Sequence, residues 1–334
     1  MADARDLCRQ EAAGGAPDEC RPKGLERFGY RPADAAFLAA AALLGGFFVR
    51  RQYRAFTGAK PGGAEHRFMR VTAKNGHVTV SRGRPQLCRL RGASLFRALR
   101  CENPTRGNGR LRRSVKQRLL ALDYWIAQDR RADFLLGPAA KAAHFAELGI
   151  PEESFPAAAR TRKGAVQRFP DRFPVRVPGP LRQSVQFAYA HAGSTAAGMT
   201  RHLKRHAGLA AALWARGIPC EWAVLADSEE QFPRLRNAWR AWTRRLKRDW
   251  SEMEYFSLRL LVQRRQWSDL TREAIERYGQ LATRHRGAAP EKRYRAWVRE
   301  GMPPRTEGGD FSRGCCWREV LMDFDYSAAD RAER

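Results

Sequence analysis

The sequence lacks an apolar run long enough to cross a membrane, and it lacks a recognisable export signal. Its longest apolar run, FLAAAALLGGFFV, covers residues 37–49, whereas a membrane-spanning helix needs about 20 apolar residues. The opening residues, MADARDLCRQEAAGG, carry mixed charge and contain no apolar segment of the secretory type. We therefore expect a cytoplasmic protein without a membrane partner.

The sequence also lacks the patterns of disulfide frameworks, metal sites and nucleotide-binding loops. Its seven cysteines are an odd number without framework spacing, so we expect free thiols. Cys315 and Cys316 are adjacent, but no second pair and no nearby histidine accompany them, which disfavours a metal or redox role. Neither a glycine-rich phosphate loop nor a GxSxG elbow is present. We therefore expect no cofactor and no nucleotide hydrolysis.

Acidic residues are nearly missing from one part of the chain. The 334 residues include 62 Lys and Arg against 35 Asp and Glu, a formal net charge of +27. Residues 50–118 hold 19 of these cations and 2 acids, and residues 234–300 hold 18 cations and 8 acids. The positive excess is thus concentrated in two blocks, and a charge of this size points to a polyanionic partner.

The first basic block coincides with a pattern of short helices followed by a hairpin. Residues 1–27 are polar and predicted to be disordered. Pro32 begins an Ala-rich helix that ends at Gly45 and Gly46. Further helices are predicted over residues 47–56 and 64–75, and two strands over 77–90 around SRGRP. Three helices and a hairpin predict a winged helix-turn-helix over residues 28–92, with a solvated helical bundle as the alternative.

Cations follow one face of the third predicted helix. Arg67, Arg70 and Lys74 fall at i, i+3 and i+7, while Phe68 and Val71 lie on a neighbouring face as core anchors. A DNA major groove admits one α-helix, and Arg can bridge two acceptors on guanine. We therefore predict that these three cations contact double-stranded DNA in the major groove. The predicted contacts to the DNA backbone are Arg50, Arg51, Arg82 and Arg84.

The remainder of the chain changes character twice. Residues 93–130 predict linker helices, of which the second joins the domains or pairs with a copy of itself. Strand patterns around a long helix predict a small α/β domain over 131–233, with a parallel strand pair. Residues 234–300 predict a basic helical extension and 301–334 a tail. Tryptophans in the extension indicate packing, or alternatively stacking on unpaired bases in an RNA-binding scaffold.

With these features the chain resembles a known family, the replication-relaxation-type proteins of plasmids and integrative, conjugative elements. The similarity lies in a basic winged helix followed by four segments: RFPDRFPVRV (168–177), VQFAYAHAGST (185–195), RHLKRHAGL (201–209) and CEWAVLADSEEQFPRL (220–235). In that family the second half resembles the PD-(D/E)XK core of restriction endonucleases. The resemblance implies a winged helix-turn-helix, a restriction-endonuclease-like α/β core and a function on the DNA of a mobile element.

A nuclease of that kind needs two acids that bind Mg²⁺ and a Lys two residues after the second acid. Asp171 could supply the first acid. On the following strand the corresponding positions hold Ala188, Ala190 and His191, and no Lys in the chain has an acid two residues before it. Residues 229–231 offer a Glu-Glu-Gln substitute, but they look like the start of a helix. The pattern favours a domain without catalysis and without a metal.

His202 and His206 are spaced at i, i+4, as metal ligands on a helix can be. Arg201, Lys204 and Arg205 flank them and disfavour a divalent cation. The pattern therefore predicts an exposed basic helix face.

Together these observations predict a duplex DNA-binding protein of a mobile element, associated with the nucleoid. We expect a non-catalytic transcriptional or replication/transfer accessory factor, whose partners beside DNA would be a second copy of the chain or a replication/transfer complex. The alternatives are a divergent Mg²⁺-dependent DNA nuclease that uses Asp171 and an RNA-binding scaffold centred on residues 234–300.

Overall fold

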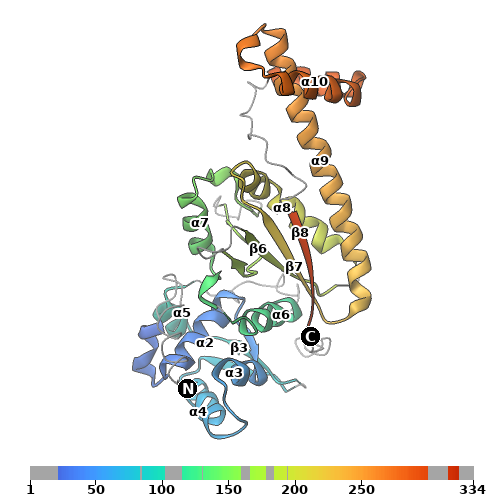
Figure 1. Ribbon diagram of the computed structural model, residues 1–334. Helices are drawn as coiled ribbons and strands as arrows, with labels where there is room; N and C mark the ends of the chain where they lie inside the picture. Colours follow the sequence, from blue (N-terminus) through green and yellow to red (C-terminus); the bar gives the residue numbers. More distant parts are fainter. Residues whose placement is uncertain are drawn as a thin grey trace, which may run out of the picture.

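The computed structural model describes residues 22–82, 85–101, 115–129, 131–158, 166–177, 184–193, 195–299 and 315–322. These residues form a mixed α and β fold with an N-terminal unit, an α/β unit and a helical arm that extends away from both (Figure 1). The mixed α and β composition predicted from the sequence is confirmed. No described helix combines the length and apolar character needed to cross a membrane.

The N-terminal unit consists of short helices around a small antiparallel sheet with the strand order β1-β3-β2. Its elements, in chain order, are the 3-10 helix η1 (Pro22–Phe28), α2 (Pro32–Leu43), β1 (Phe47–Val49), α3 (Arg50–Thr57), α4 (Gly63–Lys74), β2 (Val78–Val80), β3 (Leu87–Leu90) and α5 (Ala93–Leu99). Helix α2 is buried almost all round, which explains its Ala-rich sequence.

Two sequence-based expectations for this unit are wrong. Residues 47–49 form the strand β1 rather than the first turn of a helix, because the side chains of Phe47 and Phe48 are buried when the strand pairs with β3. Residues 22–27 were predicted as mostly disordered, but they belong to η1, whose Leu25 is fully buried. The prediction failed because Leu25 is a single apolar residue between polar and charged neighbours, which gives no periodic pattern.

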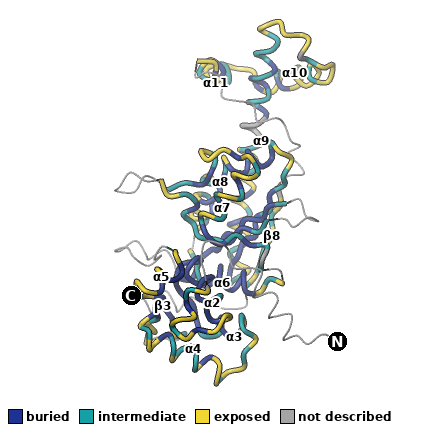
Figure 2. The backbone as a smooth tube through the Cα atoms, turned by 90° about the vertical axis from the view of Figure 1, so that its left-hand side faces the viewer, coloured by how far each residue is buried: buried dark blue, intermediate teal, exposed yellow. Residues whose placement is uncertain are grey.

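Helix α6 (Val115–Ile126) joins the two units, and it is buried on nearly all sides (Figure 2). It contacts β1 and α3 on one side and β6 and β7 on the other. The Tyr124 hydroxyl donates to Gln186 Oε1 at 2.5 Å, and Gln117 Nε2 donates to the Ala190 carbonyl at 2.7 Å. A helix enclosed in this way cannot pair with a second copy, so only its predicted linking role is supported.

The α/β unit contains a five-stranded sheet with the order β4-β5-β6-β7-β8. The strands β4, β5 and β6 are antiparallel, whereas β6, β7 and β8 are parallel. The elements of this unit are β4 (Phe134–Leu135), α7 (Pro138–Glu147), the 3-10 helix η3 (Glu152–Ser154), β5 (Val175–Arg176), β6 (Val185–Ala190), α8 (Ala197–Trp214), β7 (Cys220–Ala226), the 3-10 helix η4 (Glu229–Gln231) and β8 (Cys315–Leu321). The predicted parallel pair is confirmed as β6 and β7, and the predicted helix start at residues 229–231 is also confirmed.

Both faces of the central strands are covered, which explains why their sequences are apolar throughout. Ala188, Ala190 and Ala223 face the core that α6 shares with the N-terminal unit, and these small side chains let the helix approach closely. Phe187 and Trp222 face the second core, which lies beneath α8 and α9. Successive side chains of each strand therefore point to opposite faces of the sheet, so one set packs in the core with α6 and the other set in the core beneath α8 and α9.

The last described strand, β8, lies within the segment predicted as a tail. It pairs in parallel register with β7 from Cys315 to Leu321. The sequence-based prediction is wrong here because the partner strand is almost 90 residues away, and nothing local indicates the pairing. Cys316 is an exposed free thiol.

Helix α9 (Phe232–Gln263) begins on the sheet and continues into the arm (Figure 1). Its Trp239 and Trp242 rings each lie 5.2 Å from Trp222 and are buried, so their predicted packing role is confirmed. Beyond the sheet and the short η5 (Trp267–Asp269), α9 packs with α10 (Arg272–Arg284) and α11 (Ala288–Arg299) around a separate small core. Trp267, in contrast, is 56% exposed.

Candidate functional site

Arg67, predicted to enter a DNA groove, instead contacts a buried carboxylate. Its guanidinium forms an ion pair with Asp34, whose side chain is almost fully buried. The same carboxylate accepts hydrogen bonds from the Tyr53 hydroxyl at 2.7 Å and from the Arg31 backbone N–H at 2.9 Å. Asp34 therefore organises the packing of α2, α3 and α4, and Arg67 neutralises it.

Two further predicted DNA contacts behave in the same way. Arg50 lies beside Glu65 with a nitrogen–oxygen distance of 3.7 Å, and the neighbouring Arg54 binds the same carboxylate at 2.7 Å. The Glu65 side chain is only 4% exposed. Arg51 pairs with Asp123 of α6 at 2.6 Å. Removing these arginines for use on DNA would leave buried carboxylates uncompensated, which is costly. In the structure Arg50, Arg51 and Arg67 thus neutralise buried acids, and that they contact DNA stays a prediction.

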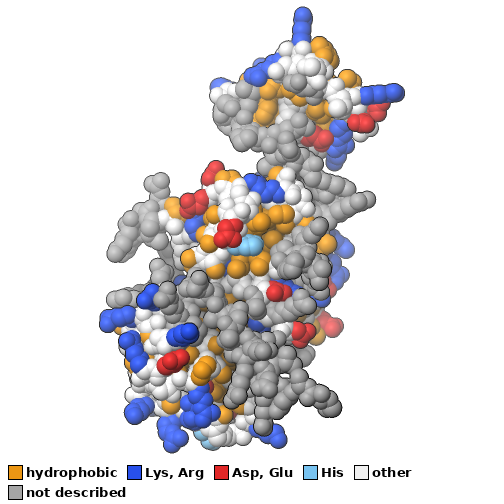
Figure 3. Space-filling view, turned by 60° about the vertical axis from the view of Figure 1, so that its left-hand side comes forward, with side chains coloured by type: hydrophobic (Ala, Val, Ile, Leu, Met, Phe, Trp, Pro, Cys, Tyr) orange, Lys and Arg blue, Asp and Glu red, His pale blue; other side chains and the backbone are white. Residues whose placement is uncertain are grey.

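The remaining predicted DNA contacts differ. Arg70 and Lys74 of α4 and Arg82 after β2 are exposed, whereas Arg84 lies outside the described residues. Lys and Arg side chains gather on the surface of the N-terminal unit, at the lower end of the molecule in Figure 3. Of the predicted DNA contacts, Arg70, Lys74 and Arg82 thus lie on the surface without a buried acid as partner in the described structure.

The chain bends sharply around Asp171, just before β5. Phe169 and Arg172 have φ angles of +45° and +50°, in the left-handed region that residues other than glycine rarely adopt. Such conformations cost about 1–3 kcal/mol each and persist where the surrounding structure enforces them. The loop therefore holds Asp171 in a fixed position.

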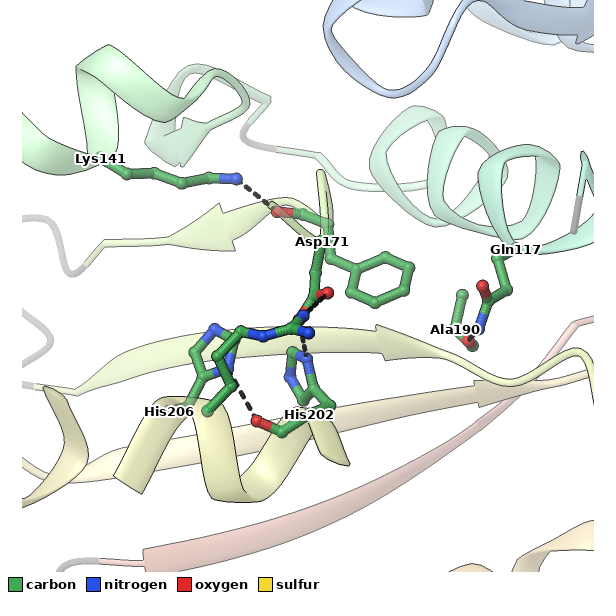
Figure 4. A network of polar contacts seen from close by, with 8 residues as sticks. Gln117, Lys141, Asp171, Ala190, His202 and His206 are labelled. Carbon is green, nitrogen blue, oxygen red and sulfur yellow. Dashed lines mark hydrogen bonds and ion pairs between the residues drawn. The ribbon is translucent and has the colours of Figure 1, made fainter. Parts of the chain in front are cut away.

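His202 and His206 point inward from α8 and are 3% and 4% exposed, so the prediction of an exposed basic helix face is wrong for them. His202 Nδ1 lies 2.9 Å from Asp171 Oδ2, and His206 Nδ1 donates to the His202 carbonyl at 3.0 Å (Figure 4). The two ring centroids lie 4.1 Å apart. His202 Nε2 is buried without a hydrogen-bond partner among the described residues.

The electrostatics of this cluster are set by one acid and several cations. Burial opposes ionisation of Asp171, but the hydrogen bond from His202 and the ion pair with Arg205 outweigh it, and the pKa of Asp171 lies below its ordinary value. Burial lowers the pKa of His206 well below its ordinary value, so this ring is neutral. Lys141 of α7 is 2% exposed and donates from Nζ to the Phe173 carbonyl at 2.7 Å.

The cluster contains residue types that bind metals, yet its charge does not suit a divalent cation. Ligating atoms of Asp171, His202 and His206 lie within 4.8 Å of one another. Both Asp171 oxygens already bind, one to His202 and one to Arg205, and Lys141 lines the same small cavity. Mg²⁺ in particular requires oxygen ligands. The residues present therefore do not fit the metal that a nuclease would use.

The second acid of such a nuclease is also missing from its position. Ala188 and Ala190 of β6 are buried, and His191 directly after the strand is buried and has its pKa lowered by burial. Asp171 thus stands without a second acid on the adjacent strand.

A pocket with a volume of about 270 Å³ opens beside Asp171, at the junction of the two units. It lies between α6, the Asp171 loop and the beginning of α8. Its charged lining consists of Arg118, Asp171, Arg172, Arg201 and Arg205. His202 and Tyr189 complete the wall next to Asp171.

Sequence reasoning identified Asp171 but missed the pocket around it. Arg201 and Arg205 follow each other at i, i+4 near the start of a helix that has no acid in its first turn, and this local signal could have been read as an anion site. Arg118 lies more than 50 residues earlier in the chain, and only the tertiary structure brings it to the pocket. No protein-family model, curated protein or solved structure matches the chain.

Proposed function

We propose that this protein binds double-stranded DNA through its N-terminal unit. The single observation that carries the proposal is the order of elements in that unit together with its exposed cations. The unit has a helix, a strand, two helices and a two-stranded hairpin, and its first strand closes the sheet in the order β1-β3-β2; this order supports the proposal of a winged helix. In such a unit α4 corresponds to the helix that enters the groove, and the β2–β3 connection to the wing.

Helix α4 has the two faces that this role requires. Phe68 is fully buried, and its ring stacks on Tyr53 at a centroid distance of 4.0 Å, which anchors the helix to the unit. Arg70 and Lys74 lie on the exposed side at i, i+4. A cationic helix face of this kind can reach base edges and phosphates in a major groove. Arg82 lies at the start of the connection between β2 and β3 and is suited to backbone contact.

The α/β unit fits the same proposal as a partner domain without catalysis. The order of three antiparallel strands, a helix and a parallel strand agrees with a restriction-endonuclease-like core. Asp171, the candidate for the first acid of such a core, binds His202 and Arg205. We therefore propose an accessory factor in transcription, replication or transfer of a mobile element, of the replication-relaxation type, rather than a nuclease.

Duplex binding across a salt series tests this function. With about 6–10 phosphate contacts, the affinity should fall by about 10³- to 10⁵-fold between 50 and 200 mM salt. The double variant Arg70→Gln/Lys74→Gln should bind at least about 10-fold more weakly than the wild type, since each charged contact contributes about 1–3 kcal/mol. Filter binding with a labelled duplex measures both effects.

The matched control is Arg240→Gln/Arg244→Gln, which removes the same charge from two exposed positions at i, i+4 on α9. If this control loses as much affinity as the α4 variant, or if affinity does not respond to salt, the proposed interface is wrong. Stronger competition by structured RNA than by duplex DNA would favour the RNA-binding alternative instead.

A further inference from the structure

We propose that the pocket between α6 and the start of α8 is a binding site for a terminal phosphate group, either of a nucleotide or of a nucleic-acid strand end. We call it the Arg201 pocket. This site is distinct from the duplex-binding surface of α4 and does not depend on it.

The charge of the Arg201 pocket is the first argument. Arg118 reaches the pocket from α6 and donates from Nη1 to the Gly45 carbonyl at 2.7 Å, while Arg172 comes from the Asp171 loop and Arg201 and Arg205 from α8. Asp171 is the only acid in the lining, and Arg205 and His202 already bind its two oxygens. Within the described part of the chain, no carboxylate pairs with Arg201. Arginines that converge from three elements on one small volume provide the planar, multiple donors that a phosphate group requires.

The helix α8 adds the second argument, because its N-terminus lies at the Arg201 pocket. The helix has 18 residues, no acid in its first turn and no side-chain hydrogen bond that caps it. Gly198, in that first turn, lines the pocket. The first backbone N–H groups of a helix lack partners within the helix, and the helix dipole favours an anion at this end. An anion in the pocket would therefore be stabilised by backbone and side chains together.

Buried polar groups form the third argument. His202 lines the pocket and is only 3% exposed, and its Nε2 has no hydrogen-bond partner among the described residues. When Nδ1 of the neutral ring donates to the Asp171 carboxylate, Nε2 carries a lone pair, so it can accept a hydrogen bond from a hydroxyl group of a ligand but does not donate to a phosphate oxygen. A Cβ atom at position 198 would lie 2.6 Å from the Tyr189 hydroxyl oxygen, so Gly198 lets this hydroxyl reach the start of α8. The positive φ of Arg172 shows that the loop is held in place against its own backbone preference.

The size of the pocket limits the occupant. A volume of about 270 Å³ is smaller than most pockets for drug-sized ligands, which measure about 300–1,000 Å³. A duplex cannot enter such a space, but a phosphate monoester with part of its nucleoside can. A monoester also carries the double negative charge that offsets several arginines, which a phosphodiester inside a strand does not.

Isothermal titration of the full chain tests the site with three probes: inorganic phosphate, a nucleoside 5′-monophosphate, and a single-stranded oligonucleotide with or without a 5′-phosphate. We expect saturable binding of the phosphorylated probes. Arg201→Gln should weaken it by about 10-fold, the loss for one charge-assisted hydrogen bond. Tighter binding of the phosphorylated oligonucleotide than of the mononucleotide would identify a strand end, and the reverse a free nucleotide.

Two further variants make the test specific. Lys204→Gln removes an exposed cation from the same helix outside the pocket and should change the affinity by less than about twofold. Ala197→Asp places an acid in the first turn of α8, which favours the helix but competes with a bound anion, so it should weaken phosphate without loss of fold. Blunt duplex without a terminal phosphate should bind the Arg201→Gln variant normally, which separates this site from the proposed function.

The proposal is overturned if no phosphorylated probe binds at millimolar concentration. It is also overturned if Lys204→Gln weakens binding as much as Arg201→Gln, or if neither the mononucleotide nor the oligonucleotide binds more tightly than the same molecule without its phosphate.

Discussion

The N-terminal unit and the α/β unit use arginine in opposite ways. The first block of positive charge in the sequence, residues 50–118, contains only 2 acids, yet Arg50, Arg51 and Arg54 are bound to carboxylates in the structure. Residues outside the two basic blocks are neutral overall, yet the Asp171 loop and α8 supply three arginines to one pocket with a single acid.

The difference teaches that charge along a sequence and charge at a surface are separate quantities. A few buried acids are enough to bind several neighbouring arginines, because an unpaired buried carboxylate is strongly disfavoured. On α8, in contrast, Arg205 binds Asp171, and no carboxylate among the described residues pairs with Arg201. Three of the four arginines that line the pocket beside Asp171 therefore come from outside the most basic segment.

The largest expected effect comes from breaking the neutralisation in the N-terminal unit. Asp34→Ala removes the acceptor of Arg67, Tyr53 and the Arg31 backbone N–H. The free energy of unfolding should fall by about 3–5 kcal/mol, because buried donors and a cation lose their partner. Denaturant unfolding measures the change. Glu26→Ala, an exposed acid in η1, should alter stability by no more than about 0.5 kcal/mol; similar effects of both changes would contradict the role of Asp34.

The buried histidines of the α/β unit should make stability depend on pH. The folded-state pKa of His206 is lowered by burial, so below about pH 6.5 the unfolded chain binds a proton that the folded chain does not. The contribution of His206 to the free energy of unfolding is therefore constant above about pH 6.5. As the pH falls below that value, the free energy of unfolding decreases, by at most about 2 kcal/mol at pH 5. The experiment compares unfolding between pH 7.5 and 5, at about half-unit steps, for the wild type and His206→Gln. Equal pH slopes for the two proteins would show that His206 protonates freely in the folded state.

A comparison of Arg67 with Arg70 separates a structural from a DNA-binding cation on the same helix. Arg67→Gln should reduce stability by leaving Asp34 uncompensated, yet leave the salt dependence of duplex binding unchanged at a temperature where the variant is folded. Arg70→Gln should leave stability nearly unchanged and weaken binding by about 10-fold. Thermal unfolding and filter binding provide the two measurements, and a result with the roles exchanged would restore the sequence-based assignment of Arg67.

The smallest effect should come from an exposed pair in the arm. Arg272 Nε lies 3.3 Å from Glu276 Oε1, and the two side chains are 92% and 63% exposed. Water and salt screen such a pair, so Glu276→Gln should change the free energy of unfolding by less than about 0.5 kcal/mol. A loss comparable to that of Asp34→Ala would mean that burial does not set the strength of ion pairs in this protein.

Local patterns were sufficient for α2, α4 and the central strands. The Ala-rich run after Pro32, the Phe68 and Val71 spacing and the apolar strands around residues 185–190 and 220–226 all lie in the predicted elements. The strand β1 was missed because its three residues need β3 for support, and β8 because it pairs with a strand far away in the sequence. Of the candidate site, Asp171 could be found from the Pro-Asp pair, but its partners could not.

By itself, the sequence determined the mixed α and β composition, the apolar faces that bury each element and the total excess of positive charge. These properties follow from local periodicity and from counting, which folding does not change. Only the tertiary structure decided which arginines are neutralised, that His202 and His206 face inward, and that Arg118 joins Arg201 beside Asp171. Such properties depend on distances between residues far apart in the chain, and these distances are set by how the two cores pack on either side of one sheet.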